Sequence, residues 1–114
     1  MRQILLIDLA DEADAIARYE AWHASGALPP AIGASIRAAD ISAMEIYRSG
    51  NRLVMLMETG PGFDPAAKAA ADAADPVVQA WETQMDAVQR PLPWAASDAK
   101  WTPATRIFSL DEQP

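Results

Sequence analysis

The hairpin at residues 41–59 constrains the fold of this 114-residue chain more than any other segment. Two strand-like runs, 41–48 and 52–59, flank the tripeptide Ser-Gly-Asn, and Gly and Asn tolerate the positive φ angles of a tight turn between antiparallel strands. The second run contains LVMLM, which is apolar on both faces of a strand. A sheet that is apolar on both faces must be covered on both faces.

The two covers of this sheet come from different sources in a chain of this length. One cover is the chain's own helices, and a second copy of the same sheet is the most economical source of the other. We therefore expect a homodimer. The alternation of side chains in the first strand of the hairpin predicts Ile41, Ala43, Glu45 and Tyr47 on one face and Ser42, Met44 and Ile46 on the other.

The segments before the hairpin predict one strand and two helices. Residues 3–9 are rich in Ile and Leu and predict a strand. The acidic cluster that follows suits the positive end of a helix dipole, so we expect a helix over residues 12–24. Pro29 and Pro30 cannot continue that helix but can begin another, which predicts a short helix within residues 27–39.

The segments after the hairpin predict two more helices and a last strand. Residues 65–74 form an alanine-rich helix, and residues 105–110 (TRIFSL) have the pattern of a strand. Pro76 opens the helix between them. The apolar stripe of that helix consists of Val77, Val78, Trp81, Met85 and Val88.

This order of elements predicts an α+β fold with an antiparallel sheet. Strand, helices, strand, strand, helices, strand is the βαββαβ pattern of a ferredoxin-like domain. When a second copy covers the open face of the sheet, the assembly is of the dimeric α+β barrel type. The length fits a single domain, residues 1–114.

The charge balance argues against a nucleic-acid partner. Nine Lys and Arg stand against sixteen Asp and Glu, a formal net charge of -7, with no basic run, whereas a phosphate-binding surface needs clustered Lys and Arg. A membrane partner is disfavoured likewise, because the opening run MRQILLIDLA is broken by Asp8 and too short to span a bilayer. That run lacks a signal-peptide cleavage site, and we expect a cytoplasmic protein.

The single histidine is the main candidate for chemistry. His23 follows Tyr19 by four residues in the expected helix, so both side chains project from one face. An ordinary histidine pKa of about 6.5 suits proton transfer near neutral pH, which makes the pair a candidate acid-base site. A lone histidine near a helix end is also typical of a purely structural contact with the last carbonyls. With one histidine and no cysteine, we expect no metal and no cofactor.

Several carboxylates are candidate partners for His23. Glu45 and Glu58 interrupt otherwise apolar strands, an arrangement that is equally typical of an exposed strand end. Asp8 and Glu20 are the other candidates.

The tryptophans fall into two groups. Trp81 lies on an apolar stripe, as does Phe108 in the expected last strand, and both are expected in the core. Trp94 and Trp101 lie in a proline-rich loop where no buried stripe requires them. Indole rings pack against the C–H faces of sugars, but they also simply close small domains, so an aromatic-lined pocket is one of two hypotheses for these residues.

Several common catalytic motifs are absent from the chain. There is no GxGxxG, no P-loop and no GxSxG, and the glycines at 60 and 62 belong to a turn. The sequence therefore argues against nucleotide binding and Ser-His-Asp chemistry.

Five segments together resemble one known family. They are Tyr19-Glu-Ala-Trp-His23, MEIYRSGNRLVMLME (44–58), KAAADAADPVVQAWE (68–82), PLPWA (91–95) and Lys100-Trp101 followed by RIFSL. In these segments the chain resembles the L-rhamnose and L-fucose mutarotases, and it is most similar to the L-fucose-acting members. The resemblance spans nearly the whole chain and implies a dimeric ferredoxin-like fold.

The resemblance also implies roles for individual residues. His23 matches the family's proton donor, Tyr19 matches a sugar-binding tyrosine, and Trp81 matches the first of two tandem tryptophans that contact the sugar. The second tandem position is Glu82 in this chain, and a sugar-binding strand tyrosine of the family aligns with Met44. The other sugar-binding candidates are Glu45, Tyr47, Glu58 and Trp101.

The function implied by the resemblance is that of a sugar mutarotase. Such an enzyme interconverts the α and β anomers of a 6-deoxy-L-sugar by acid-base ring opening, here L-fucose first and L-rhamnose second. Two alternatives stay open. One is a non-catalytic dimeric ferredoxin-like binding or stress-response module, and the other is a cofactor-free monooxygenase or isomerase of the dimeric α+β barrel type.

Overall fold

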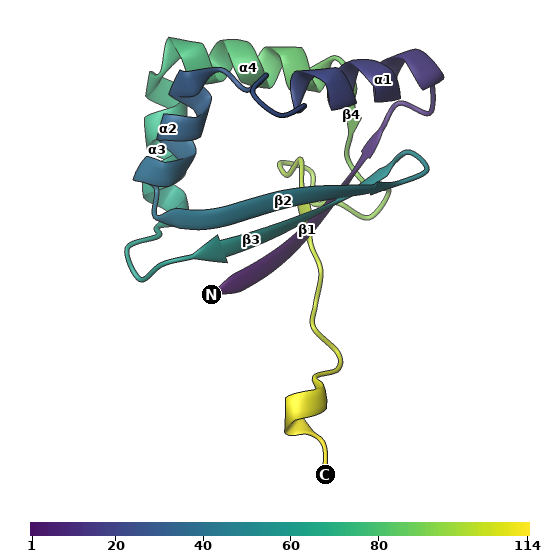
Figure 1. The fold of residues 1–114 in the computed structure, drawn as a ribbon, viewed down its shortest axis with the longest axis vertical. Coiled ribbons are helices and arrows are strands. Elements are labelled where there is room, and N and C mark those ends of the chain that lie inside the picture. The colour runs from purple at the N-terminus through teal and green to yellow at the C-terminus, as the bar shows by residue number, and fades with distance from the viewer.

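The computed structural model describes residues 1–114 and places four helices on one side of a five-stranded sheet (Figure 1). The longer strands are β1 (Arg2–Leu9), β2 (Ile41–Ser49) and β3 (Arg52–Thr59), and two short strands are β4 (Gln89–Arg90) and β5 (Thr102–Pro103). The helices are α1 (Ala13–Trp22), α2 (Pro30–Ala38), α3 (Pro65–Ala74) and α4 (Pro76–Asp86), and a single turn of 3₁₀ helix, η1, spans Leu110–Glu112.

The sheet is antiparallel throughout and has the strand order β2-β3-β1-β4. The hairpin of β2 and β3 is confirmed, and β3 pairs with β1 along nearly its full length. The opposite edge of β1 is shared by β4 and β5. The predicted α+β, ferredoxin-like arrangement with an antiparallel sheet is therefore the one that the structure has.

The register of the three long strands separates the sheet into two faces. Residues directly opposite each other point to the same face, and successive residues alternate. The face covered by the helices, here called the helix face, carries Leu5, Ile7, Leu9, Met44, Ile46, Leu53, Met55 and Met57. The other face, here called the outer face, carries Ile4, Leu6, Ala43, Glu45, Tyr47, Val54, Leu56 and Glu58.

One residue of β2 departs from the predicted alternation. Ile41 was expected on the same face as Ala43, but it pairs with Thr59 and is only 6% exposed, whereas Ala43 pairs with Glu58 on the outer face. The cause is a β-bulge between Ile41 and Ala43, which inserts one residue and shifts the alternation. Ile41 therefore adds to the apolar cover under the helices.

Three of the four helices begin with a proline, and side-chain caps reinforce two of these starts. The Asp64 carboxylate accepts a hydrogen bond from the Ala66 N–H at 3.0 Å, and the Asp75 carboxylate accepts one from the Val77 N–H at 2.9 Å. All four helices are short, and none combines the length and hydropathy required to cross a membrane.

The core lies between the helices and the helix face. Tyr19 of α1 and Met85 of α4 each expose 3% of their surface and pack in one cluster with buried residues of β1 and β3. Trp81 and Trp101 are partly buried and pack against this cluster. In the apolar stripe of α4, Val78 is buried, but Val77 is 48% exposed and does not belong to the core.

The predicted last strand at residues 105–110 is wrong. The strand that pairs with β1 is β5, which ends two residues before this segment begins. Phe108 is 64% exposed rather than in the core. Continuing the β5 register, in which Leu5 faces Pro103, would bring Arg106 opposite Arg2, the first residue of β1. Two like charges would then face each other, and β1 leaves no partner for residues 107–110. The segment instead extends away from the sheet as an arm, residues 105–114 (Figure 1).

Candidate active site

A cavity of about 510 Å³ lies between the helices and the helix face of the sheet. The apolar part of its lining comes from α2, from α4 and from the β2–β3 hairpin. Most ligand sites in proteins are concave and apolar with a few placed polar groups, and this cavity has that character. The polar and aromatic side chains that line it are Tyr19, His23, Ser35, Arg37, Ser42, Lys68, Asp72, Trp81, Glu82, Gln89 and Trp101.

Three rings from two helices meet in the cavity wall. The imidazole of His23 stacks on the Tyr19 ring, with centroids 4.1 Å apart and an interplanar angle of 25°. The ring centroids of His23 and Trp81 lie 5.4 Å apart with an interplanar angle of 64°, an edge-to-face arrangement. His23 follows the last residue of α1, and the helical spacing of four brings its ring over Tyr19. The imidazole is therefore fixed between α1 and α4.

A hydrogen bond to the backbone assigns the protons of His23. Its Nδ1 lies 2.7 Å from the Tyr19 carbonyl oxygen, which only accepts, so Nδ1–H is the donor. In the neutral ring Nε2 then carries a lone pair. Burial lowers the pKa of His23 below its usual 6.5, although the bond to the Tyr19 carbonyl opposes this effect. At neutral pH the ring is uncharged and Nε2 is a base.

Tyr19 is a hydrogen-bonding group that stays protonated. Burial raises the pKa of its phenol to about 12; the Gln89 side chain lowers it, and the negative charge of Glu82 raises it further. The hydroxyl therefore keeps its proton throughout the physiological pH range. Gln89 and Glu82 line the same cavity as Tyr19 and His23.

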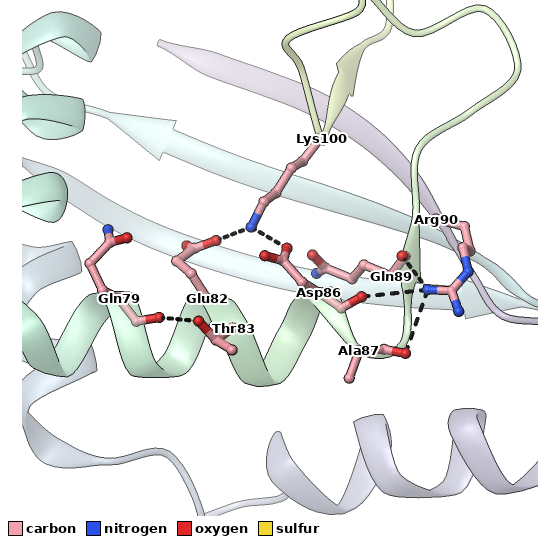
Figure 2. Close-up of polar contacts among 8 residues, drawn as sticks. All are labelled: Gln79, Glu82, Thr83, Asp86, Ala87, Gln89, Arg90 and Lys100. Carbon is pink, nitrogen blue, oxygen red and sulfur yellow. Dashed lines mark hydrogen bonds and ion pairs between the residues drawn. The ribbon is translucent and has the colours of Figure 1, made fainter.

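An ion-pair cluster joins α4 to the loop that precedes β5. Lys100 Nζ lies 2.5 Å from Glu82 Oε2 and 2.5 Å from Asp86 Oδ1, and Figure 2 shows the ammonium reaching down between the two carboxylates. Partial burial lowers the pKa of Lys100, but the hydrogen bonds to Asp86 and Glu82 outweigh it and raise the pKa above its usual value. The lysine is therefore charged, and it fixes the residue that follows it, Trp101, beside the cavity.

A second polar group lines the cavity from α2 and α3. Lys68 Nζ contacts Asp72 Oδ1 at 2.6 Å and Ser35 Oγ at 3.1 Å, and Ser35 donates to the same carboxylate at 3.3 Å. The three side chains satisfy one another, and the Lys68–Asp72 pair also follows the i,i+4 spacing of α3. This group ties α2 to α3.

The structure brings together four of the residues singled out from the sequence. His23, Tyr19, Trp81 and Trp101 all line the cavity. Trp94, the other tryptophan of the proline-rich loop, does not line the cavity. It is 64% exposed, and the Arg52 guanidinium lies 5.4 Å from its ring centroid.

The other three predicted site residues lie on the outer face of the sheet. Tyr47 is 55% exposed, and the negative charge of Glu45 beside it raises the pKa of its phenol. Glu58 pairs with Arg2 at 3.0 Å. None of the three lines the cavity of His23 in this chain.

The remaining carboxylates that were considered as partners of His23 are also engaged elsewhere. Asp8 accepts two hydrogen bonds from Arg52, at 2.8 and 3.2 Å, and Glu20 pairs with Arg48. No group of three or more His, Asp or Glu side chains is arranged to hold a metal ion.

Sequence reasoning missed Glu82 and Gln89. Glu82 lies four residues after Val78 and three before Met85, so it interrupts the buried stripe of α4. A carboxylate within a buried helical stripe is a signal that could have identified it. Gln89, 8% exposed, had no such signal, because it lies in a two-residue strand that only the folded sheet defines.

Comparisons with known proteins identify the family to which the chain belongs. A family model described as L-rhamnose mutarotase matches residues 2–110. An L-fucose mutarotase from Xanthomonas campestris pv. campestris is 50% identical over 111 residues, covering 97% of this chain and 89% of that protein. A crystal structure of an L-rhamnose mutarotase from Formosa agariphila has the same fold, with a TM-score of 0.65 and 14% identity over 96% of this chain and 98% of that one. The resemblance drawn from the sequence is confirmed, and the chain belongs to the L-rhamnose mutarotase family.

Proposed function

We propose that this chain interconverts the α and β anomers of a 6-deoxy-L-sugar, with L-fucose as the first candidate and L-rhamnose as the second. The observation that carries the proposal is the uncharged His23 ring, fixed by the Tyr19 carbonyl and lining a cavity large enough for a monosaccharide. The half-identical L-fucose mutarotase supports the choice of sugar.

The proposed reaction uses Nε2 of His23 first as a base and then as an acid. Nε2 takes the proton of the anomeric hydroxyl, the C1–O5 bond breaks, and C1 becomes the carbonyl carbon of the open-chain aldehyde. The imidazolium returns the proton to O5, so that no proton is gained or lost. Rotation about C1–C2 followed by the reverse steps closes the other anomer.

The surrounding side chains bind the sugar in this proposal. The protonated Tyr19 hydroxyl donates a hydrogen bond, and the indoles of Trp81 and Trp101 pack against the C–H faces of the sugar ring. Because the reaction already proceeds in water, a proton-transfer contribution of ~10²–10⁴-fold from one histidine is sufficient for a useful enzyme.

Anomeric exchange measured by saturation-difference NMR with L-fucose tests the proposal. We expect the protein to transfer saturation between the α and β anomeric protons faster than buffer alone. Exchange at the buffer rate, with sugar binding retained, would instead indicate a non-catalytic binding module. A thermal shift with an apolar aromatic ligand but none with L-fucose would favour the monooxygenase-type alternative, since a ligand that binds the native state raises its apparent stability.

The proposal includes a homodimer formed through the outer face. Ile4, Leu6, Val54 and Leu56 form an apolar band across the centre of this face, and no element of the chain's own helices covers it. The arm adds exposed apolar side chains, with Ile107 94% and Leu110 74% exposed. Contiguous exposed apolar surface is typical of an interface between proteins, and a second sheet is its simplest cover.

Light scattering coupled to size-exclusion chromatography tests the dimer. We expect twice the chain mass for the wild type and a monomer for Leu56→Asp, which places a charge in the middle of the apolar band. A monomeric wild type would contradict this part of the proposal. A cytoplasmic location also belongs to the proposal, and cell fractionation tests it.

A further inference from the structure

We infer that Glu82 is a specificity-determining residue that binds sugar hydroxyls in the same cavity as His23. This inference rests on the proposed function, and it adds a hydrogen-bond acceptor for the sugar hydroxyls, which neither His23 nor the aromatic walls provide. Three observations support it: the position of Glu82 in the cavity wall, its carboxylate oxygen that has no partner, and its contact with Lys100.

Glu82 lies in the same wall of the cavity as the aromatic residues. It follows Trp81 on α4, and Trp81 contacts the His23 ring. Its charge also reaches the Tyr19 phenol, whose pKa it raises. The carboxylate therefore lines the same cavity as the Tyr19–His23 pair.

Only one carboxylate oxygen of Glu82 has a partner within the chain. Oε2 accepts from Lys100 at 2.5 Å, and no protein donor reaches Oε1. The side chain is 40% exposed and lines the cavity, so the carboxylate is open to a ligand there. A carboxylate has acceptor sites for several donors, and two neighbouring hydroxyls of a monosaccharide are donors of suitable size and spacing.

Lys100 holds this carboxylate in a defined position. Its ammonium bridges Glu82 and Asp86 and thereby limits the rotamers of Glu82 (Figure 2). A binding group whose orientation is fixed before the ligand arrives loses less entropy on binding. Since Trp101 follows Lys100 directly, the same contact keeps the indole next to the hydroxyl-binding oxygen.

Asp86 provides a matched control for Glu82. Both carboxylates lie on α4 and pair with Lys100 at 2.5 Å, but only Glu82 lines the cavity. Glu82→Gln and Asp86→Asn therefore remove the same charge and the same type of ion pair. They differ in whether the altered side chain lines the cavity.

The test measures KM and kcat for anomeric exchange of L-fucose in the two variants. We expect Glu82→Gln to raise KM about tenfold with kcat changed much less, because hydroxyl binding acts on the ground state as well. Asp86→Asn should stay within about twofold of the wild type, the range of a surface ion pair. Equal effects of the two substitutions would overturn the inference, since both would then act through Lys100.

Deoxy sugars distinguish a binding contact from a structural one. The 2-, 3- and 4-deoxy analogues of L-fucose each lack one hydroxyl, and we expect the Glu82→Gln penalty to disappear for the analogue that lacks the bound hydroxyl. The same penalty with every analogue would contradict a direct contact.

The inference and the proposed function fail in different ways. If the wild type exchanges L-fucose and Glu82→Gln behaves as Asp86→Asn does, only the role of Glu82 is overturned. If the wild type binds L-fucose without exchange, the proposed function fails, and the same variants are compared by their Kd values in a titration. A wild type that does not bind L-fucose at all overturns both.

Discussion

The two faces of the sheet are built from the same strands but serve different purposes. On the helix face, Leu53 is 1% exposed, and above it the helices enclose the cavity that holds His23 and Glu82. On the outer face, Leu56 is only half-buried, and the ends of the apolar band carry the ion pairs Asp8–Arg52 and Arg2–Glu58. The comparison shows that a carboxylate on a strand can belong to the site only if its side chain lies on the face of the sheet that lines the cavity. Glu45 and Glu58 are on the other face, and a carboxylate that lines the cavity of His23, Glu82, comes from a helix.

The largest expected effect separates the two faces by stability. Leu53→Ala should lower the free energy of unfolding by about 2–5 kcal/mol, because it opens a cavity in the closed core. Leu56→Ala should cost less than about half of this at low protein concentration, since its side chain is already partly in water. Urea unfolding measures both.

Protein concentration sharpens the same comparison. If the outer face is covered by a second copy, the cost of Leu56→Ala grows with protein concentration, whereas the cost of Leu53→Ala is nearly constant. Equal losses for the two variants at every concentration would mean that the faces are equally closed within one chain.

The next effect separates the two faces by ligand binding. Trp81→Ala should raise KM for the sugar about tenfold, a loss of about 1.4 kcal/mol, because the indole forms a wall of the cavity. Trp94→Ala is the matched control, since Trp94 lies against Arg52 outside the cavity. A larger loss of sugar binding for Trp94→Ala than for Trp81→Ala would contradict the position of the ligand in the cavity on the helix face.

A smaller effect follows from the lowered pKa of His23. Between this pKa and 6.5 the unfolded chain binds a proton that the folded chain does not, so stability rises with pH across that window. On acidification below pH 6.5, the wild type should lose melting temperature faster than His23→Gln, which has no titrating ring. The catalysed exchange rate should likewise persist below pH 6.5 until the ring protonates. A midpoint for the loss of exchange above pH 6.5 would contradict the lowered pKa.

The smallest expected effect concerns the charged ends of the outer face. Arg52→Gln removes the ion pair with Asp8, in which the arginine side chain is 43% exposed. We expect only a small loss of stability in urea unfolding, because exposed ion pairs contribute little. A loss as large as that of Leu56→Ala would show that this end of the outer face is closed to solvent.

Local signals in the sequence were enough for most of the fold. The Ser49-Gly50-Asn51 turn, the prolines that begin three helices and the run in β3 that is apolar on both faces depend on residues close together in the chain, and the structure confirms each. The spacing of Tyr19 and His23 is equally local, and it placed their rings in contact.

The features that the sequence did not predict depend on distant residues. TRIFSL has the pattern of a strand, but pairing requires a neighbour, and β1 begins at Arg2. The bulge at Ser42 is a property of the pairing of two strands. Glu45 and Glu58 lie on the open face of the sheet because the helices pack on the opposite face. No local pattern specifies which of the two faces the helices cover.

The central claim is that His23, within the cavity of the helix face, transfers the protons of ring opening. Saturation-difference NMR with L-fucose on the wild type and on His23→Ala tests it most directly, with circular dichroism to show that the variant is folded. We expect exchange well above the buffer rate in the wild type and a fall of ~10²–10⁴-fold in the catalysed rate for His23→Ala. A folded His23→Ala variant that exchanges the anomers as fast as the wild type would contradict the account.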